Sequence, residues 1–331
     1  MAECTSGMGL NGPRSVAVVI AAKNAEATIA RAVRSALAEP EAEQVVLIDD
    51  GSSDGTSGVA RRAAEGDDRL ILRRNPVSGG PAAARNLGVS LSRATWVTPL
   101  DADDYFQGGR LGRLLDQAQG ADFVADDLLT LREGAEDQPP KRVIGDREPL
   151  PLTLDFTTFV EANISRAGRP RREYGFLKPL MRRAFLAQHG LAYDPQVRLG
   201  EDFVLYARAL ALGAVFRVTP PCGYVAIQRP GSLSGDHSTQ DLQRLRDASA
   251  ALVVTPELTP REQLAARRHL RHVQAKVDLR EVIDARRAGG VMRGLLAIAA
   301  RPENAPYIFA RMAEDKWAAR HGPRSDIEAD A

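Results

Sequence analysis

Two scarcities in this 331-residue chain narrow the classes of protein to which it can belong. It has only two cysteines, Cys4 and Cys222, and they lie far apart, so a reducing compartment without a disulfide framework is expected. No apolar run reaches the roughly 18 residues of a membrane span. Residues 1–14 lack the charged start and apolar stretch of a signal peptide. The sequence therefore predicts a cytoplasmic protein.

The chain also has almost no net charge, and it lacks the common glycine-rich phosphate-binding motifs. Lys and Arg number 44 and Asp and Glu 43, and a net charge of +1 gives no reason to expect nucleic acid as a partner. No GxGxxG follows the first predicted strand, and GxxxxGK[ST] occurs nowhere. Neither a dinucleotide-binding fold nor a P-loop is therefore expected.

Short apolar runs alternate with helix-forming segments through the first hundred residues. The continuous run Val16–Ala21 is typical of a strand covered on both faces. Strands are predicted at 16–21, 45–48, 70–72 and 94–100, and helices from residue 24, at 57–64 and at 81–91. The alternation indicates an α/β fold with a Rossmann-like, mostly parallel central sheet flanked by helices.

Three carboxylates cluster directly after the fourth predicted strand, at Asp101, Asp103 and Asp104. Such a group repels itself in a low-dielectric setting unless a cation is present. A divalent ion would relieve the repulsion and could also bind a diphosphate. An acidic turn that caps a helix is the alternative. Polar loops also follow the first two strands, at Lys23-Asn24 and Asp49-Asp50, and open α/β sheets bind ligands at this edge. The pattern favours a nucleotide held by carboxylates and a metal.

Several motifs follow one another at a specific spacing between residues 16 and 238. They are Val18–Asn24, Ile48–Thr56, Gly80–Asn86, Leu100–Asp104, Lys178–Leu180, Gly200–Phe203 and Arg229–Ser234. With them the chain resembles family 2 glycosyltransferases of the GT-A fold, and within that family the enzymes of succinoglycan-type exopolysaccharide synthesis. It departs from the family pattern at Ala21, where proline is common, and at Lys23, where an aromatic residue often stands.

The resemblance implies that the chain binds a UDP-sugar donor, with UDP-glucose the first expectation. Asp50 would accept a hydrogen bond from an N–H of the uracil edge, and Arg85 would reach the ribose or diphosphate, since a guanidinium suits phosphate. Further donor contacts are expected from Ala21, Lys23, Asn24, Asp101, Ala102, Arg229, Ser232 and Ser234. The alternatives are a turn with a helix cap for Asp50 and a solvated helix-face arginine for Arg85.

A divalent cation, Mg²⁺ or Mn²⁺, is the expected cofactor. Asp103 is the predicted direct ligand, with Asp104 supporting the loop, because such ions are usually held by one or two carboxylates and substrate phosphates. His237 would close over the diphosphate or complete the metal shell. An ordinary loop histidine is the alternative there.

Glu201 and Asp202 precede a predicted helix that begins at Phe203. A carboxylate at a helix N-terminus is favoured in its charged form, which a general base requires. By resemblance Asp202 is the base and Glu201 positions the acceptor; two acids that merely cap a helix are the alternative. The implied reaction is a single displacement with inversion, in which Asp202 deprotonates a hydroxyl of a glycan or lipid-linked oligosaccharide. No second carboxylate suited to act as the nucleophile of a double displacement is evident.

Two other functions remain open at this point. A sugar nucleotidyltransferase also uses acidic metal loops, but it needs a glycine-rich basic loop where Ala21–Asn24 stands. A non-catalytic sugar-nucleotide-binding protein is the second alternative, and an intact Asp202 argues against it.

The resemblance fades beyond residue 238, where a basic region with helical periodicity begins. Interspersed acids make a solvated, salt-bridged face the simplest interpretation of residues 241–290. Peripheral docking on an anionic membrane surface is the alternative, with Val291–Ala300 packing on the domain or touching the bilayer. The predicted organisation is a flexible tail at 1–14, a GT-A domain at 15–240, a helical extension at 241–321 and a polar tail at 322–331. Within the GT-A domain, residues 15–127 form the nucleotide-sugar half and residues 128–240 the acceptor half.

Overall fold

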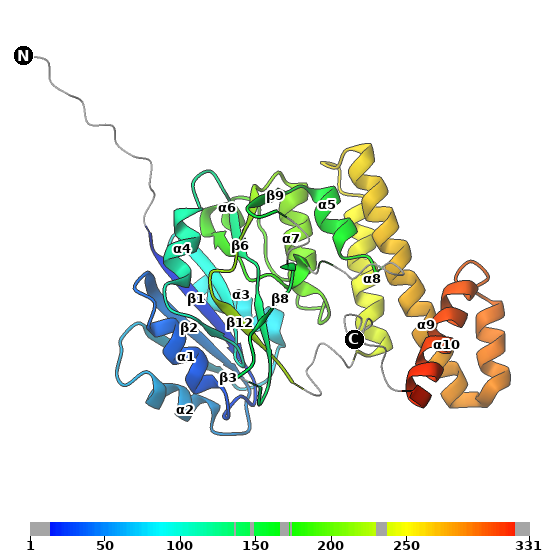
Figure 1. Ribbon diagram of the computed structural model, residues 1–331, viewed down its shortest axis with the longest axis horizontal. Coiled ribbons are helices and arrows are strands. Elements are labelled where there is room, and N and C mark those ends of the chain that lie inside the picture. Colours follow the sequence, from blue (N-terminus) through cyan, green and yellow to red (C-terminus); the bar gives the residue numbers. More distant parts are fainter. Residues whose placement is uncertain are drawn as a thin grey trace, which may run out of the picture.

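An eight-stranded sheet lies at the centre of the computed structural model (Figure 1). The structure describes residues 14–135, 137–145, 149–165, 172, 174–229 and 237–321, with the backbone alone at 315 and 318–321. Residues 1–13 of the expected tail at 1–14 and the whole expected tail at 322–331 lie outside these residues, and so do Ser232 and Ser234. Arg14 is described and forms an ion pair with Asp116.

One half of the central sheet is parallel. Its strands, in spatial order, are β3 (Leu70–Asn75), β2 (Ala42–Asp50), β1 (Val16–Ala22) and β4 (Trp96–Asp101). Val46 and Ile48 of β2 face one layer of helices, whereas Val45 and Leu47 face the other. This period of two puts apolar side chains on both faces, which is why the strands read as unbroken apolar runs.

Three helices cover the parallel half of the sheet. They are α1 (Ile29–Leu37), α2 (Thr56–Ala63) and α3 (Pro81–Leu91). Helix α3 packs closely on β1 because residue 88 is glycine: a Cβ there would lie 2.3 Å from Cγ1 of Val19. The layers and the alternation confirm the predicted fold class.

The predicted helix that opens at residue 24 begins later, at Ile29. Asn24 has a left-handed backbone conformation, with φ of 51°, so it cannot belong to a right-handed helix. The backbone N–H groups of Asn24 and Ala25 donate instead to Ser52 Oγ at 2.9 Å and Thr56 Oγ1 at 2.8 Å. Tertiary hydrogen bonds from the β2–α2 loop therefore replace the first helical turn.

The other half of the central sheet is mixed. Beyond β4 follow β10 (Leu180–Arg182), β6 (Phe123–Asp126), β11 (Phe216–Thr219) and β9 (Leu152–Leu154). Strand β10 is antiparallel to both of its neighbours, and β9 is antiparallel to β11. Around this half lie α4 (Arg110–Asp116), α5 (Phe156–Ala162), the short 3-10 helix η2 (Tyr174–Phe176), α6 (Arg183–Gln188) and α7 (Glu201–Ala211).

A smaller sheet lies beside the central one. Its order is β5 (Tyr105–Phe106), β12 (Tyr224–Gln228), β7 (Leu129–Arg132) and β8 (Lys141–Arg142). The phenol of Tyr224 accepts the backbone N–H of Asp101 at 3.2 Å, which ties this sheet to the end of β4.

Three long helices form the C-terminal extension, at the right of Figure 1: α8 (Thr239–Val253), α9 (Pro260–Ala299) and α10 (Ala305–His321). The ring of Phe203 in α7 stacks on His269 of α9, with centroids 4.3 Å apart, so the extension packs directly on the α/β part. Helix α9 is broken at Gly289 and Gly290. Across the described residues, none of the helices is long and apolar enough to cross a bilayer.

Candidate active site

The polar loops after β1, β2 and β4 meet at one edge of the central sheet. Ala21 of β1 pairs with Ile48 on one side and with Asp101 on the other, and Ala22 pairs with Asp49. Because the three strands are parallel and in step, their carboxyl ends are adjacent. The predicted convergence of these loops is therefore present.

A buried network of charges joins this edge to the start of α7. The guanidinium of Arg85 in α3 donates from Nη2 to Asp101 Oδ1 at 2.8 Å and from Nη1 to Glu201 Oε1 at 2.7 Å. Nζ of Lys178 lies 3.0 Å from Asp101 Oδ2 and 2.8 Å from Asp202 Oδ2. Two cations thus link Asp101 at the end of β4 to the two acids of α7.

Burial makes the pairing in this network strong. Arg85 and Lys178 are each only 6% exposed. Burial alone would lower the pKa of Lys178, but the carboxylates of Asp101 and Asp202 raise it above its usual range. Burial raises the pKa of Asp101, yet Lys178 and Arg85 together hold it far below its ordinary value. The lysine is therefore cationic and Asp101 ionised at neutral pH.

Asp202 has one oxygen firmly held and one held weakly. Its Oδ2 accepts from Lys178, whereas its Oδ1 lies 3.5 Å from the phenol of Tyr206 and 3.9 Å from Arg85 Nη1. Gly200, with φ of 72°, caps α7, so Glu201 and Asp202 stand in its first turn beside unpaired helix amides. Oδ1 is thus the oxygen better placed to take a proton.

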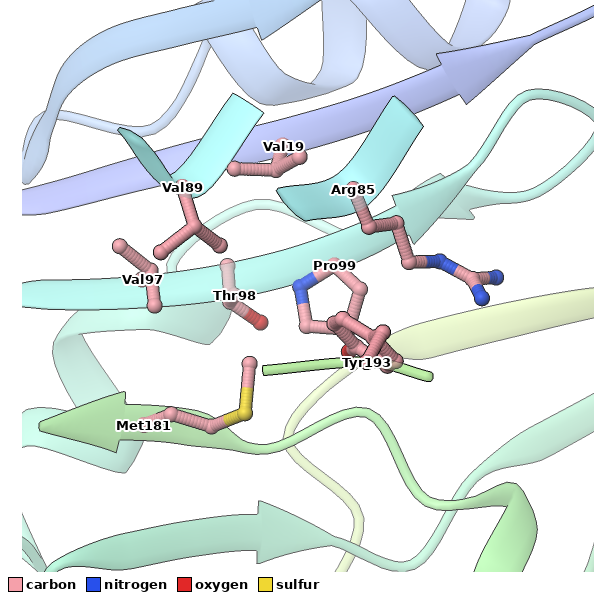
Figure 2. Close-up of a pocket in the computed structure, with 8 residues that line it drawn as sticks. All are labelled: Val19, Arg85, Val89, Val97, Thr98, Pro99, Met181 and Tyr193. Atoms are coloured by element: carbon pink, nitrogen blue, oxygen red, sulfur yellow. The ribbon is translucent and has the colours of Figure 1, made fainter. Parts of the chain in front are cut away.

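Two tyrosines complete the walls of the network. Arg85, Pro99 and Tyr193 line the same pocket in Figure 2, and the guanidinium carbon of Arg85 lies 5.5 Å from the centre of the Tyr193 ring. The phenol of Tyr193 is buried. Tyr206 donates to the backbone oxygen of Leu177 at 3.1 Å, next to Lys178.

The acidic loop after β4 places its three carboxylates in three different environments. Asp101 belongs to the charge network, and Asp104 is buried, accepting from the Tyr224 phenol and the Ile227 N–H, both at 2.8 Å. Asp103 is partly exposed, and its carboxylate forms no ion pair with any residue in the described ranges. Burial and the negative charge of Asp101 raise the pKa of Asp103.

The environment of Asp103 fits a divalent cation that shares ligands with a substrate. Its carboxylate is repelled by a neighbouring acid, and a bound cation would offset that repulsion. Within the described part of the chain, no group of three or more His, Cys, Asp or Glu side chains has the spacing of a metal site. Further ligands would then have to come from phosphate oxygens and water, as is usual for Mg²⁺.

His237 is not joined to the acidic loop by any contact among the described residues. Its backbone oxygen accepts from Arg280 Nη2 at 2.8 Å, directly before the Ser238 cap of α8. Arg229 forms an ion pair with Glu133, with Nε 3.2 Å from Oε1. The metal role of His237 and the donor role of Arg229 stay predictions.

Asp50 organises the loop that leads into α3. Its two oxygens accept four hydrogen bonds, from Asn75 Nδ2 at 2.9 Å, Ser78 Oγ at 2.6 Å, and the N–H groups of Gly79 at 2.9 Å and Gly80 at 2.8 Å. Burial raises the pKa of Asp50, but these donors together hold it below its usual value. Four donors fill the ordinary capacity of a carboxylate, so a base N–H would have to replace one of them.

The other predicted donor residues lie around the same edge. Asn24 Oδ1 accepts the N–H of Ser53 at 2.9 Å and so braces the β2–α2 loop. Lys23 is exposed, while Ala21 and Ala102 are partly buried. The structure thus places these three residues on the rim of the site.

Lys178 is the main site residue to which the sequence assigned no role. It belongs to one of the spaced motifs, Lys178–Leu180, and a lysine next to the apolar strand β10 was the available signal. Its partners lie 24 and 77 residues away along the chain, so spacing alone did not reveal the pairing.

Comparisons with known proteins agree with this geometry. The sequence model described as glycosyl transferase family 2 matches residues 17–169. The succinoglycan biosynthesis protein ExoU of Rhizobium meliloti is 47% identical over 304 residues, which cover 92% of this chain and 88% of that protein. ExoO of the same organism is 36% identical over 66% of this chain and 62% of its own length.

Solved structures show the same fold at low sequence identity. The crystal structure of Staphylococcus aureus TarS 1–349 in complex with UDP-GlcNAc has a TM-score of 0.59 and 15% identity, covering 94% of this chain and 93% of that one. The GT-A architecture that the motifs implied is thereby confirmed. With the family model on residues 17–169 and a relative of 47% identity along nearly its whole length, this chain belongs to glycosyl transferase family 2.

Proposed function

We propose that this glycosyltransferase is a metal-dependent inverting enzyme that moves a hexose from a UDP-sugar to a hydroxyl of a glycan acceptor in exopolysaccharide synthesis. The name of the relative ExoU supports the pathway, and TarS, which shares the fold, is known with UDP-GlcNAc bound. UDP-glucose as donor and a lipid-linked acceptor are the specific forms of the proposal.

One observation carries this proposal: a single buried lysine joins the expected base to the expected donor loop. Lys178 contacts both Asp101 at the end of β4 and Asp202 at the start of α7. A transferase needs its base close to the anomeric carbon, so the two loops must be held at a fixed separation. The lysine provides that separation before either substrate arrives.

The reaction follows from the two oxygens of Asp202. The acceptor hydroxyl gives its proton to Oδ1 while its oxygen forms a bond to the anomeric carbon. The bond from that carbon to the phosphate oxygen breaks, and UDP leaves. A Mg²⁺ or Mn²⁺ ion bound by Asp103 and the diphosphate would offset the negative charge of the leaving group.

The charge network also supports inversion over double displacement. A double displacement needs a carboxylate free to attack the anomeric carbon. Asp101 has both oxygens engaged by Arg85 and Lys178, and Glu201 is engaged by Arg85. Asp202 Oδ1 is held only by the longer contacts to Tyr206 and Arg85, which suits a base.

Two alternative functions, a sugar nucleotidyltransferase and a non-catalytic sugar-nucleotide binder, fit the observations less well. Membership of family 2 argues against a nucleotidyltransferase. The loop after β1 is also braced on Ser52 rather than built as a glycine-rich phosphate cradle. A non-catalytic binder would have no use for a base held by a buried lysine.

A donor screen tests the proposal. Purified protein is mixed with UDP-glucose, UDP-galactose and UDP-GlcNAc in Mn²⁺, Mg²⁺ or EDTA, and UDP release and binding are measured. We expect one UDP-hexose to be turned over faster than the others and release to stop in EDTA. Full activity in EDTA contradicts the metal, and failure to bind any UDP-sugar contradicts the donor class.

A further inference from the structure

The break in α9 creates a separate short helix at the end of the molecule. Gly289 and Gly290 have non-helical backbone angles, and Gly290, with φ of 75°, adopts a conformation that L side chains rarely take. The chain then resumes as a helix from Val291 to Ala299, which we call the outer helix. In Figure 1 this part of α9 and α10 form the orange and red end, away from the parallel half of the sheet.

One face of the outer helix packs inward. Gly294 and Ile298 are buried, and Ile298 belongs to a small apolar cluster with Val282 and Ile308. A Cβ at position 294 would lie 3.1 Å from Cβ of Arg286, so the outer helix lies close against the part of α9 before the break. These contacts fix which side of the outer helix faces solvent.

An adjacent face of the outer helix is apolar and exposed. Val291, Met292, Leu295 and Leu296 recur at helical spacing and are 63%, 68%, 49% and 64% exposed. On the neighbouring helix α10, Phe309 is 54% exposed. Large apolar side chains grouped on one helix face mark an interaction surface, whereas scattered ones do not.

The charges around this face are of one sign. Residues 285–302 contain four arginines, at 286, 287, 293 and 301, and no aspartate or glutamate. Arg301 turns inward to Asp278 and Glu281, whereas Arg286, Arg287 and Arg293 are exposed. Arg293 lies on the outer helix itself, and Arg286 and Arg287 lie just before the break. Three exposed arginines with no partner among the described residues thus flank the apolar face along the chain.

The arginines earlier in the extension are arranged differently. Arg268 forms an ion pair with Glu161 at 2.6 Å, and Arg280 donates to the backbone oxygen of His237. Arg246 pairs with Asp247. These contacts engage part of that basic stretch, and its exposed arginines, such as Arg267 and Arg271, lie near a single exposed large apolar side chain, Leu264. The alternative of a lipid-facing surface is therefore better sought beyond the break, where several such side chains are grouped.

We propose that the outer helix docks on an anionic membrane surface, with Val291, Met292, Leu295 and Leu296 entering the interface and Arg286, Arg287 and Arg293 contacting lipid headgroups. An apolar helix face bordered by arginines is the composition of interfacial helices. A stable protein interface takes roughly 20–30 residues on each side, more than this face offers. Charge complementarity and size thus favour a lipid surface over a second copy of the chain. This docking needs neither donor nor acceptor and goes beyond the proposed reaction.

Sedimentation with vesicles tests the inference on the full-length protein. We use vesicles of phosphatidylcholine alone and of a 7:3 mixture with phosphatidylglycerol. Wild type should bind the anionic vesicles at low salt. Leu295→Ser with Leu296→Ser should weaken binding by roughly tenfold or more, because two apolar side chains no longer enter the interface. Changing Arg286, Arg287 and Arg293 to Gln should cost roughly fivefold for each arginine at low salt and less at high salt.

Matched controls separate docking from general surface effects. Val254 and Leu264, which are 75% and 46% exposed elsewhere on the extension, are changed to Ser, and Arg267 with Arg271 to Gln. These variants should bind vesicles as the wild type does. In Leu295→Trp, quenching by brominated lipid should show insertion, whereas Val254→Trp should stay unquenched.

Three outcomes overturn the inference. They are absence of wild-type binding to anionic vesicles, unchanged binding of the Leu295/Leu296 variant, and self-association in solution that this variant abolishes while vesicle binding is absent. UDP binding measured on the same variants is independent of docking. If the wild type did not bind UDP, the proposed donor would be contradicted. If a variant that no longer docks on vesicles still binds UDP, the proposed reaction is unaffected by the failure of docking.

Discussion

Two groups of carboxylates face the same edge of the sheet, and they differ in where their countercharges come from. Asp101, Glu201 and Asp202 are paired within the protein by Arg85 and Lys178. Asp103, two residues from Asp101, has no cationic side chain paired with it in the described structure.

The difference suggests separate roles for the two sets of carboxylates under the proposed reaction. A paired group keeps its geometry whether or not substrate is present, as a base that must be aimed requires. An unpaired carboxylate instead keeps its capacity for a ligand that arrives with the substrate. The network around Lys178 is thus built in advance, and under the proposed reaction the acidic loop would be completed when the cation and the donor bind.

The largest loss of transfer activity is expected at Asp103, whose countercharge would come from a bound cation. Asp103→Ala removes the predicted protein ligand of the cation, so transfer should fall below detection and UDP should bind more weakly in Mn²⁺ or Mg²⁺. Turnover assays and calorimetric titration with UDP measure both. Asp116→Ala, an exposed aspartate of α4, is the control. Unchanged turnover in Asp103→Ala would show that the acidic loop holds no catalytic metal.

The next effect concerns the base. Asp202→Asn keeps the size of the side chain but cannot accept the proton, so the transfer rate should fall by roughly 10²–10⁴-fold. UDP affinity should persist, because the donor loop keeps Asp101 paired to Arg85. Asp247→Asn on the exposed face of α8 is the matched control. If UDP binding were lost together with activity, Asp202 would belong to the donor site instead.

The smallest effect on transfer is expected at Lys178, which holds the base without touching the reacting atoms. Lys178→Met leaves Asp101 and Asp202 short of a partner, so unfolding free energy should drop by about 3–5 kcal/mol. Transfer by the folded fraction should fall on the order of 10- to 10²-fold through misplacement.

Lys178→Arg restores the charge and should recover most of the stability. Urea denaturation and single-turnover assays at low temperature separate the two effects. Lys141→Met, at an exposed position of β8, should change neither. A Lys178→Met protein as stable and active as the wild type would contradict the role of Lys178 in stabilising the fold and positioning Asp202.

The fold and half of the site follow from local patterns. Apolar runs at 16–21 and 45–48 set the parallel strands, and parallel strands bring Asp49, Asp50 and Asp101 to one edge. Strand β10 escaped prediction because three residues, Leu180–Arg182, carry no usable periodicity. Its antiparallel insertion is what brings Lys178 beside β4.

Side-chain partners were the harder part. The uracil contact of Asp50 stays a prediction, whereas its protein partners were not foreseen: the loop from Asn75 to Gly80 folds back and places four donors on its carboxylate. Which donors reach a carboxylate depends on loop conformation, and loop conformation depends on tertiary contacts that no single segment encodes. The same holds for the start of α1, which the hydroxyls of Ser52 and Thr56 delay.

The stacking of Phe203 on His269 has a consequence for protein engineering. Phe203 directly follows Asp202, the proposed base, and its ring is also stacked on Phe159 at 5.5 Å, so the ring lies between α5 and α9. A chimera that keeps this catalytic domain and replaces its C-terminal helices would have to supply a flat ring at position 269. Without it, Phe203 in the first turn of α7 would lose one of its two stacking partners, and the orientation of the Asp202 side chain would depend on the replacement helices. The boundary for exchanging modules therefore lies beyond α9, not at the end of the α/β part.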